Sequence, residues 1–229
     1  MSLVIAHRGA SRAAPENTVT AFELAARQGT DGVELDVRRT ADHVLVVHHD
    51  PALPDGRTIS ECSAADLPAS VATFDEALDA CAGIFVNIEI KNDPSEPDFD
   101  ATEWVAQTVV ARLARRGGGP RWLISSFRVE TVNRVRQLLP SVRTGWLVSE
   151  ISDTVLDVCV DRGHAAVHPW VGALTKPQVI AAHGRGIAVN TWTCDEPARI
   201  SELFSWGIDG VCTNVPDIAL QVRASRRGT

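Results

Sequence analysis

Short runs rich in β-branched and other apolar residues alternate along the chain with stretches where apolar residues recur at helical spacing. The pattern predicts strands at residues 3–6, 32–37, 84–90, 122–125, 144–148, 165–167, 187–191 and 210–212. It predicts helices at residues 18–28, 74–81, 102–115, 129–138, 153–161, 176–182, 196–206 and 217–224. Asn17 stands where a helix N-cap is expected, and Gly29, Gly163 and Gly207 follow three of the helices, as C-terminal glycines do.

The regular alternation of strand and helix predicts a parallel sheet covered by helices. Eight such units in 229 residues leave roughly 29 residues each, enough for a strand, a helix and two short loops. Eight repeats favour an α/β fold of the TIM (β/α)8 barrel type, in a short version, over an open doubly wound sheet. No glycine-rich nucleotide-binding motif follows a strand, which weighs further against the open sheet. An extra strand at residues 44–48 makes the second unit irregular, and we expect residues 1–229 to form a single domain.

Charge, cysteine spacing and hydropathy limit the kinds of ligand and cellular location that we expect for this protein. The formal net charge is −7, which argues against nucleic acid because phosphate backbones bind basic faces. The five cysteines are widely spaced without a CxxC pair, so neither a zinc site nor a disulfide framework is expected. The first strand begins within a few residues of Met1, and no apolar run reaches membrane-spanning length. We therefore expect a cytoplasmic protein without stable membrane insertion; its oligomeric state is left open.

Polar side chains recur where the predicted strands end. In a barrel these ends converge on one mouth, where active sites are built. The residues at these positions are His7, Arg8, Glu34, Asp36, Glu89, Lys91, Ser126, His168, Trp192 and Asn214. We expect His168 and Ser126 to line a substrate pocket, with Ser126 and Asn214 the weaker candidates for direct contact.

Glu34 and Asp36 are two positions apart in one strand, so their side chains point to the same face. Paired carboxylates repel each other unless a proton or a cation is shared between them. With Glu89 from another strand they predict a site for a hard divalent cation such as Mg²⁺ or Ca²⁺. The alternative is that the pair projects into solvent from an edge strand. Lys91 is interpreted as a counter-ion for Glu89, as a contact for a substrate anion, or as both.

His7 and His49 are the candidate proton carriers, because histidine can gain or lose a proton near neutral pH. His48 should point away from His49 if the segment is extended. The remaining histidines, His43, His164 and His183, are interpreted as structural.

The motifs AHRGAS, PENT, DGVELDV, VVHHDP, FVNIEIK, ISSF, NTWT and GVCTNVPD, in this order over nearly the whole chain, resemble the glycerophosphodiester phosphodiesterase family. The resemblance implies a TIM-barrel enzyme that uses a divalent cation, with Mn²⁺ as a further choice, and two histidines. It assigns metal ligation to Glu34, Asp36 and Glu89, acid–base catalysis to His7 and His49, phosphate contact to Arg8 and Lys91, and the alcohol side of the pocket to Trp192.

The implied reaction is hydrolysis of a small-molecule glycerophosphodiester to sn-glycerol 3-phosphate and an alcohol. The family usually inserts several dozen residues after the HDP motif, whereas here the next predicted helix follows quickly. We therefore expect a reduced insertion after the second strand and a more open mouth. Two alternatives stay open: phospholipase D-like hydrolysis of lysophospholipids or sphingomyelin, and a catalytically silent barrel that binds a phosphodiester.

Overall fold

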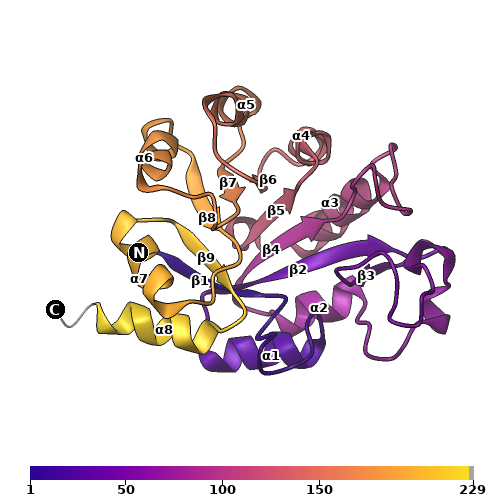
Figure 1. Ribbon diagram of the computed structural model, residues 1–229. Coiled ribbons are helices and arrows are strands. Elements are labelled where there is room, and N and C mark those ends of the chain that lie inside the picture. Colours follow the sequence, from indigo (N-terminus) through magenta and orange to yellow (C-terminus); the bar gives the residue numbers. More distant parts are fainter. Residues whose placement is uncertain (227–229) are drawn as a thin grey trace.

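The computed structural model, which describes residues 1–226, closes eight parallel strands into a barrel (Figure 1). Closure results from β1, which pairs with β2 on one side and with β9 on the other. The barrel strands are β1 (Leu3–His7), β2 (Gly32–Arg39), β4 (Phe85–Ile90), β5 (Trp122–Ser126), β6 (Arg143–Val148), β7 (Ala166–Pro169), β8 (Ala188–Thr191) and β9 (Gly210–Thr213). The predicted TIM barrel is confirmed.

A helix follows every barrel strand and packs outside the barrel (Figure 1). The helices are α1 (Val19–Gln28), α2 (Phe74–Ala80), α3 (Trp104–Arg116), α4 (Val129–Leu138), α5 (Asp153–Arg162), α6 (Lys176–Gly184), α7 (Pro197–Trp206) and α8 (Pro216–Ser225). None of the helices within residues 1–226 combines the length and apolar character needed to cross a membrane.

The ends of the helices agree with the sequence at the glycines and differ at Asn17. Gly29, Gly163 and Gly207 adopt left-handed backbone conformations that end α1, α5 and α7. The N-cap of α1 is Thr18, whose hydroxyl accepts a hydrogen bond from the Ala21 amide. Asn17 instead has a φ of 56° and directs its side-chain amide to Asp36. The expected cap is therefore wrong by one residue, because a tertiary hydrogen bond recruits Asn17.

The irregular second unit contains the extra strand β3 (Leu45–Val47), which pairs antiparallel with β2. Two short 3₁₀ turns, Ile59–Glu61 and Ala64–Asp66, follow before α2 begins. Leu53 and Ile59 from this segment pack with Val46 of β3 into a small hydrophobic cluster. The reduced insertion is thus folded against the β2–β3 edge.

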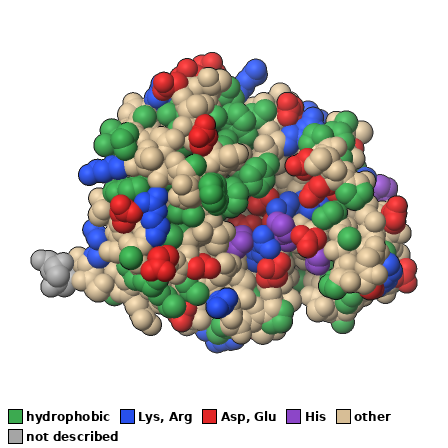
Figure 2. Space-filling model, viewed as in Figure 1, with side chains coloured by type: hydrophobic (Ala, Val, Ile, Leu, Met, Phe, Trp, Pro, Cys, Tyr) green, Lys and Arg blue, Asp and Glu red, His purple; other side chains and the backbone are tan. Residues whose placement is uncertain are grey.

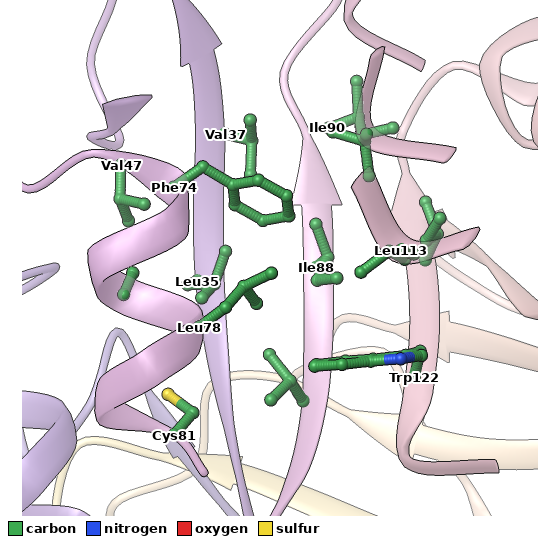
Figure 3. Close-up of a cluster of buried hydrophobic side chains, with 14 of the residues drawn as sticks. Leu35, Val37, Val47, Phe74, Leu78, Cys81, Ile88, Ile90, Leu113 and Trp122 are labelled. Atoms are coloured by element: carbon green, nitrogen blue, oxygen red, sulfur yellow. The ribbon is translucent and has the colours of Figure 1, made fainter. Parts of the chain in front are cut away.

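Alternation along β2 decides which side chains enter the barrel. Leu35 and Val37 belong to the hydrophobic layer between strands and helices, where Phe74 and Leu78 of α2 meet them (Figure 3). Each such fully buried side chain contributes roughly 1.5–3 kcal/mol to folding. Because neighbouring residues in a strand face opposite ways, this packing turns the intervening residues toward the barrel axis.

The apolar layer divides into two large clusters. One joins the strands β1–β5 to the helices α1–α4, and the other lies mainly between β6–β9 and the helices α5–α8. Each half of the barrel therefore has its own hydrophobic layer, and the pocket at the mouth is lined from both halves.

Candidate active site

Three buried carboxylates meet at the mouth of the barrel. Glu34 and Asp36 come from β2, and Glu89 comes from β4, the neighbouring strand, in register with Asp36. One oxygen from each carboxylate lies within 4.8 Å of one from each of the others. All three residues are buried. The predicted convergence of these side chains is therefore present, and the alternative of an exposed edge strand is wrong.

Two cationic side chains balance part of this negative charge. The Lys91 Nζ lies 3.0 Å from Asp36 Oδ1 and 2.5 Å from Glu89 Oε1. The Arg8 Nε lies 3.3 Å from Asp36 Oδ2. Burial acts to raise the pKa of Asp36, but Lys91 and Arg8 outweigh it and hold this pKa below its ordinary range.

Glu34 is less well compensated than Asp36. Burial raises its pKa well above the ordinary value, and the nearby charges of Asp36 and Glu89 raise it further. One of its oxygens, Oε2, accepts a hydrogen bond from the Arg8 amide, whereas Oε1 is buried without a hydrogen-bond partner among the described residues. An oxygen of this kind beside two other carboxylates fits a hard divalent cation.

His7 lies at the end of β1, and a chain of hydrogen bonds fixes its ring. The Asn214 amide donates to Asp195 Oδ2, so that its oxygen Oδ1 faces His7 Nδ1 at 2.7 Å. His7 Nδ1 therefore carries the proton, and Nε2, which lies 4.0 Å from Glu34 Oε2, is free to accept one when the ring is neutral. Burial and the Arg8 charge lower the pKa of His7.

His49 approaches the same pocket from the segment after β3. Its Nδ1 lies 2.6 Å from a carboxylate oxygen of Asp50. This hydrogen bond lowers the pKa of Asp50, which stays ionised beside the ring. His48 directs its Nδ1 to the Asp50 backbone oxygen and does not line the pocket, as predicted.

The opposite wall of the pocket comes from the second half of the chain and is neutral. Trp192 and Phe127 meet edge to face with their ring centres 5.3 Å apart, and the indole N–H of Trp192 donates to the His168 carbonyl. Burial lowers the pKa of His168 to about 3, so this ring is uncharged and accepts a hydrogen bond from the Asn190 amide. Figure 2 shows histidine, basic and acidic side chains gathered in a central hollow beside apolar ones. The pocket is concave and combines a few charged groups with apolar lining residues, as small-molecule sites do.

Residues 7–218 match the glycerophosphoryl diester phosphodiesterase family. The chain belongs to this family. It is 27% identical to the glycerophosphodiester phosphodiesterase of Bacillus altitudinis, over 97% of this chain and 98% of that protein. It is 26% identical to the one from Caldanaerobacter subterraneus, over 96% and 97% of the two chains. A phosphodiesterase from Oleispira antarctica, solved in complex with the product sn-glycerol-3-phosphate, superposes with a TM-score of 0.90 at 25% identity, covering 98% of this chain and 97% of that one.

Most of the residues predicted for this phosphodiesterase-family site line one pocket. They are His7, Arg8, Glu34, His49, Glu89, Lys91, His168 and Trp192. Asp36 lies in the buried carboxylate cluster. Ser126 lines a neighbouring cavity, and its buried hydroxyl donates to the Ile90 carbonyl and accepts from the Arg128 amide. Ser126 therefore stabilises the ends of β4 and β5, and its hydroxyl is not directed at the main pocket.

Several lining residues were not found from the sequence. Asn87 and Asn190 each precede a predicted site residue by two positions, Glu89 and Trp192, so the same-face rule for strands would have found both. Phe127 comes directly after a strand end and lacks such a signal. Its place opposite Trp192 depends on contacts between distant segments of the chain.

Proposed function

We propose that this protein hydrolyses glycerophosphodiesters to sn-glycerol 3-phosphate and an alcohol, with a divalent cation and two histidines. The observation that supports this most directly is a buried cluster of three carboxylates flanked by His7, His49 and two cationic side chains in one pocket. Family membership supports the reaction class, and the Oleispira antarctica relative is described with the corresponding product. We propose that the chain acts as one domain.

Glu34, Asp36 and Glu89 would hold the cation, and oxygen ligands of this kind suit Mg²⁺, Ca²⁺ or Mn²⁺. When bound, the cation supplies positive charge to the phosphoryl oxygens as negative charge develops on them.

Arg8 and Lys91 contact the phosphate in this proposal while they also balance the carboxylates. Two of the three ammonium donors of Lys91 face Asp36 and Glu89, which leaves one for a phosphate oxygen. The two interpretations of Lys91, counter-ion and anion contact, are therefore compatible. Fixed positive charge in a largely buried pocket stabilises the transition state more strongly than it would in water.

The two histidines divide the proton transfers. His7 accepts the proton of the attacking oxygen at Nε2, because its Nδ1 is committed to Asn214. His49 donates a proton to the leaving alkoxide, and the hydrogen bond between its Nδ1 and the Asp50 carboxylate orients its ring. Trp192, Phe127 and the neutral His168 line the side of the pocket that receives an alcohol group.

Replacing either histidine tests this assignment. We expect His7→Ala and His49→Ala each to lower kcat by at least about a hundredfold, since a positioned acid or base contributes typically 10²–10⁴-fold. The assay measures sn-glycerol 3-phosphate released from glycerophosphocholine. His183→Ala is the matched control, because His183 pairs with Asp209 and does not line the pocket. Normal turnover in a folded His7 or His49 variant would remove that residue from the mechanism.

A lysophospholipid substrate is the second candidate, and one observation favours it. Phe127 is 45% exposed at the edge of the pocket, beside Trp192, and offers apolar surface to an acyl chain. Turnover of lysophosphatidylcholine and glycerophosphocholine under the same metal conditions separates the two substrates. Faster turnover of the lysolipid, reduced selectively in Phe127→Ala, would favour this candidate. Binding of both compounds without turnover of either would instead favour the silent binding barrel.

A further inference from the structure

His49 is the one proposed proton carrier that lies outside the barrel strands. β3 ends at Val47, and His49 follows in the loop that leads away from the barrel. Its side chain is 36% exposed, in contrast to 17% for His7. The last backbone hydrogen bond to β2 is made one residue earlier, where the His48 amide donates to the Asp36 carbonyl. A further contact is therefore needed to fix the His49 carbonyl relative to the carboxylate cluster.

Arg38 of β2 supplies contacts of the required kind. It follows Glu34 and Asp36 at the same two-residue spacing, so its side chain points to the same face of the strand. The guanidinium Nε and Nη2 both donate to the His49 carbonyl oxygen, at 2.8 and 2.5 Å. Two donors of one rigid, planar group that converge on a single acceptor define its position more closely than one hydrogen bond does.

Two carboxylates hold the guanidinium from its other side. Nη1 donates to Asp98 Oδ2 at 2.6 Å and to Glu96 Oε2 at 2.9 Å, and Nη2 donates to Glu96 Oε1 at 3.1 Å. Both carboxylates belong to the segment between β4 and α3. Arg38 therefore connects the loop of His49 to the segment that follows β4, the strand of Glu89.

Direct contact between Arg38 and a substrate is excluded by its burial. Its side chain is fully buried, and it lines neither the main pocket nor the adjoining cavity that His49 and Glu96 share. A buried charge is costly unless it is paired and hydrogen-bonded. The buried Arg38 guanidinium is paired with two carboxylates, and its remaining hydrogen bonds go to the backbone of His49, a proposed catalytic residue.

We propose that Arg38 is a positioning residue for His49: it holds the His49 backbone at the rim so that the imidazole reaches the leaving oxygen. This inference rests on the proposed role of His49. A displacement of about 1 Å in a catalytic group can cost on the order of a hundredfold in rate. Loss of the guanidinium should therefore lower kcat with little effect on KM.

A double-mutant cycle on the full chain tests the proposal. The four proteins are wild type, Arg38→Met, His49→Ala and the double variant, assayed with glycerophosphocholine at saturating divalent cation. We expect Arg38→Met to lower kcat by about 10- to 100-fold with KM within about threefold. In the His49→Ala background the same substitution should change kcat by less than about threefold, because the group it positions is gone.

Arg223→Met is the matched control for loss of a partly buried, ion-paired arginine. Arg223 bonds Asp31 and the Ser2 carbonyl, away from the lining of the pocket, and its replacement should leave kcat unchanged in the folded protein. Asp98→Asn loosens the guanidinium without removing its bonds to His49. It should show a smaller kcat loss that also disappears in the His49→Ala background, and it serves if Arg38→Met fails to fold.

The outcomes separate this inference from the proposed function. The positioning role is overturned if Arg38→Met lowers kcat equally in the wild-type and His49→Ala backgrounds, and the catalytic role of His49 then stands. The same holds for Asp98→Asn where that variant replaces Arg38→Met. An unchanged kcat in these variants overturns it as well. A normal kcat in His49→Ala alone contradicts the proposed catalytic role of His49 first, and the positioning role with it.

Discussion

Asp36 and Glu34 lie on one strand and one face, yet their surroundings differ. Asp36 faces Lys91, Arg8 and the side-chain amide of Asn17, so both its oxygens have partners. Glu34 keeps a buried oxygen without a hydrogen-bond partner among residues 1–226. Burying such a group costs free energy that only a bound cation or proton can recover. The site therefore lowers the stability of the metal-free protein at this residue.

Glu34→Gln should consequently stabilise the metal-free protein while it impairs activity. The raised pKa of Glu34 means that the folded state favours the protonated form, so stability falls as the pH rises above the pKa of an unfolded glutamate. Glutamine does not ionise and can still accept the hydrogen bond from Arg8. We expect the free energy of unfolding at pH 7 in EDTA to rise by about 1 kcal/mol.

Urea unfolding of wild type and variant at pH 5 and pH 7 measures this effect. The difference in free energy of unfolding between wild type and Glu34→Gln should be larger at pH 7 than at pH 5. Glu23→Gln, on the exposed face of α1, is the control and should change little at either pH. A variant less stable than wild type at pH 7 in EDTA would show that the Glu34 charge is already compensated.

At the scale of the elements, alternation within strands made most of the site predictable. The apolar positions of β2 and β4 pack against helices, which places Glu34, Asp36 and Glu89 inside the barrel. Contacts between distant segments were not predictable in this way. The Asn17 side chain donates to Asp36 and does not cap α1, and Arg38 bonds Asp98, which lies sixty residues later in the chain. No local pattern encodes such pairings, because each depends on how separate loops fold over the mouth.

Helix α2 offers a test of local encoding. Thr73 and Glu76 form a capping box, in which the Thr73 hydroxyl accepts from the Glu76 amide and the Glu76 carboxylate accepts from the Thr73 amide. Thr73→Ala should lower the free energy of unfolding by about 1 kcal/mol, whereas Thr73→Ser keeps the hydroxyl and should lower it far less.

Chemical denaturation measures both variants, and kcat at 25 °C should stay at the wild-type value because α2 packs on the outer face of the barrel. Equal stability of Thr73→Ala and wild type would mean that the tertiary contacts of Phe74 and Leu78 alone determine where α2 begins.

At the scale of the whole molecule, cation binding should raise the melting temperature. A ligand that binds only the folded state raises the melting temperature by mass action. We expect Mg²⁺, Ca²⁺ or Mn²⁺ to raise the Tm of the EDTA-treated wild type by several degrees, with the preferred ion effective at the lowest concentration. Differential scanning fluorimetry of wild type and Glu89→Gln measures this.

The Glu89 variant should lose most of the cation-induced shift, since the three carboxylates act together. Turnover of glycerophosphocholine should cease in EDTA and return with the ion that raises Tm. A Tm and a turnover that are both indifferent to chelator and to all three ions would contradict a metal site at this cluster.

The charged groups of the pocket, from His7 to Lys91, all lie in the first 91 residues, whereas its neutral wall comes from Phe127 onward. In the proposed mechanism, the first stretch supplies the groups that cleave the bond and the second supplies the wall that receives the alcohol, with Asn214 and Asp195 of the second stretch holding the His7 ring. During divergence, exchanges in the later stretch that retain Asn214 and Asp195 would change which headgroup is accepted while the groups that break the ester stay in place. Recombining half-barrels from different relatives would accordingly be a practical route to new selectivity.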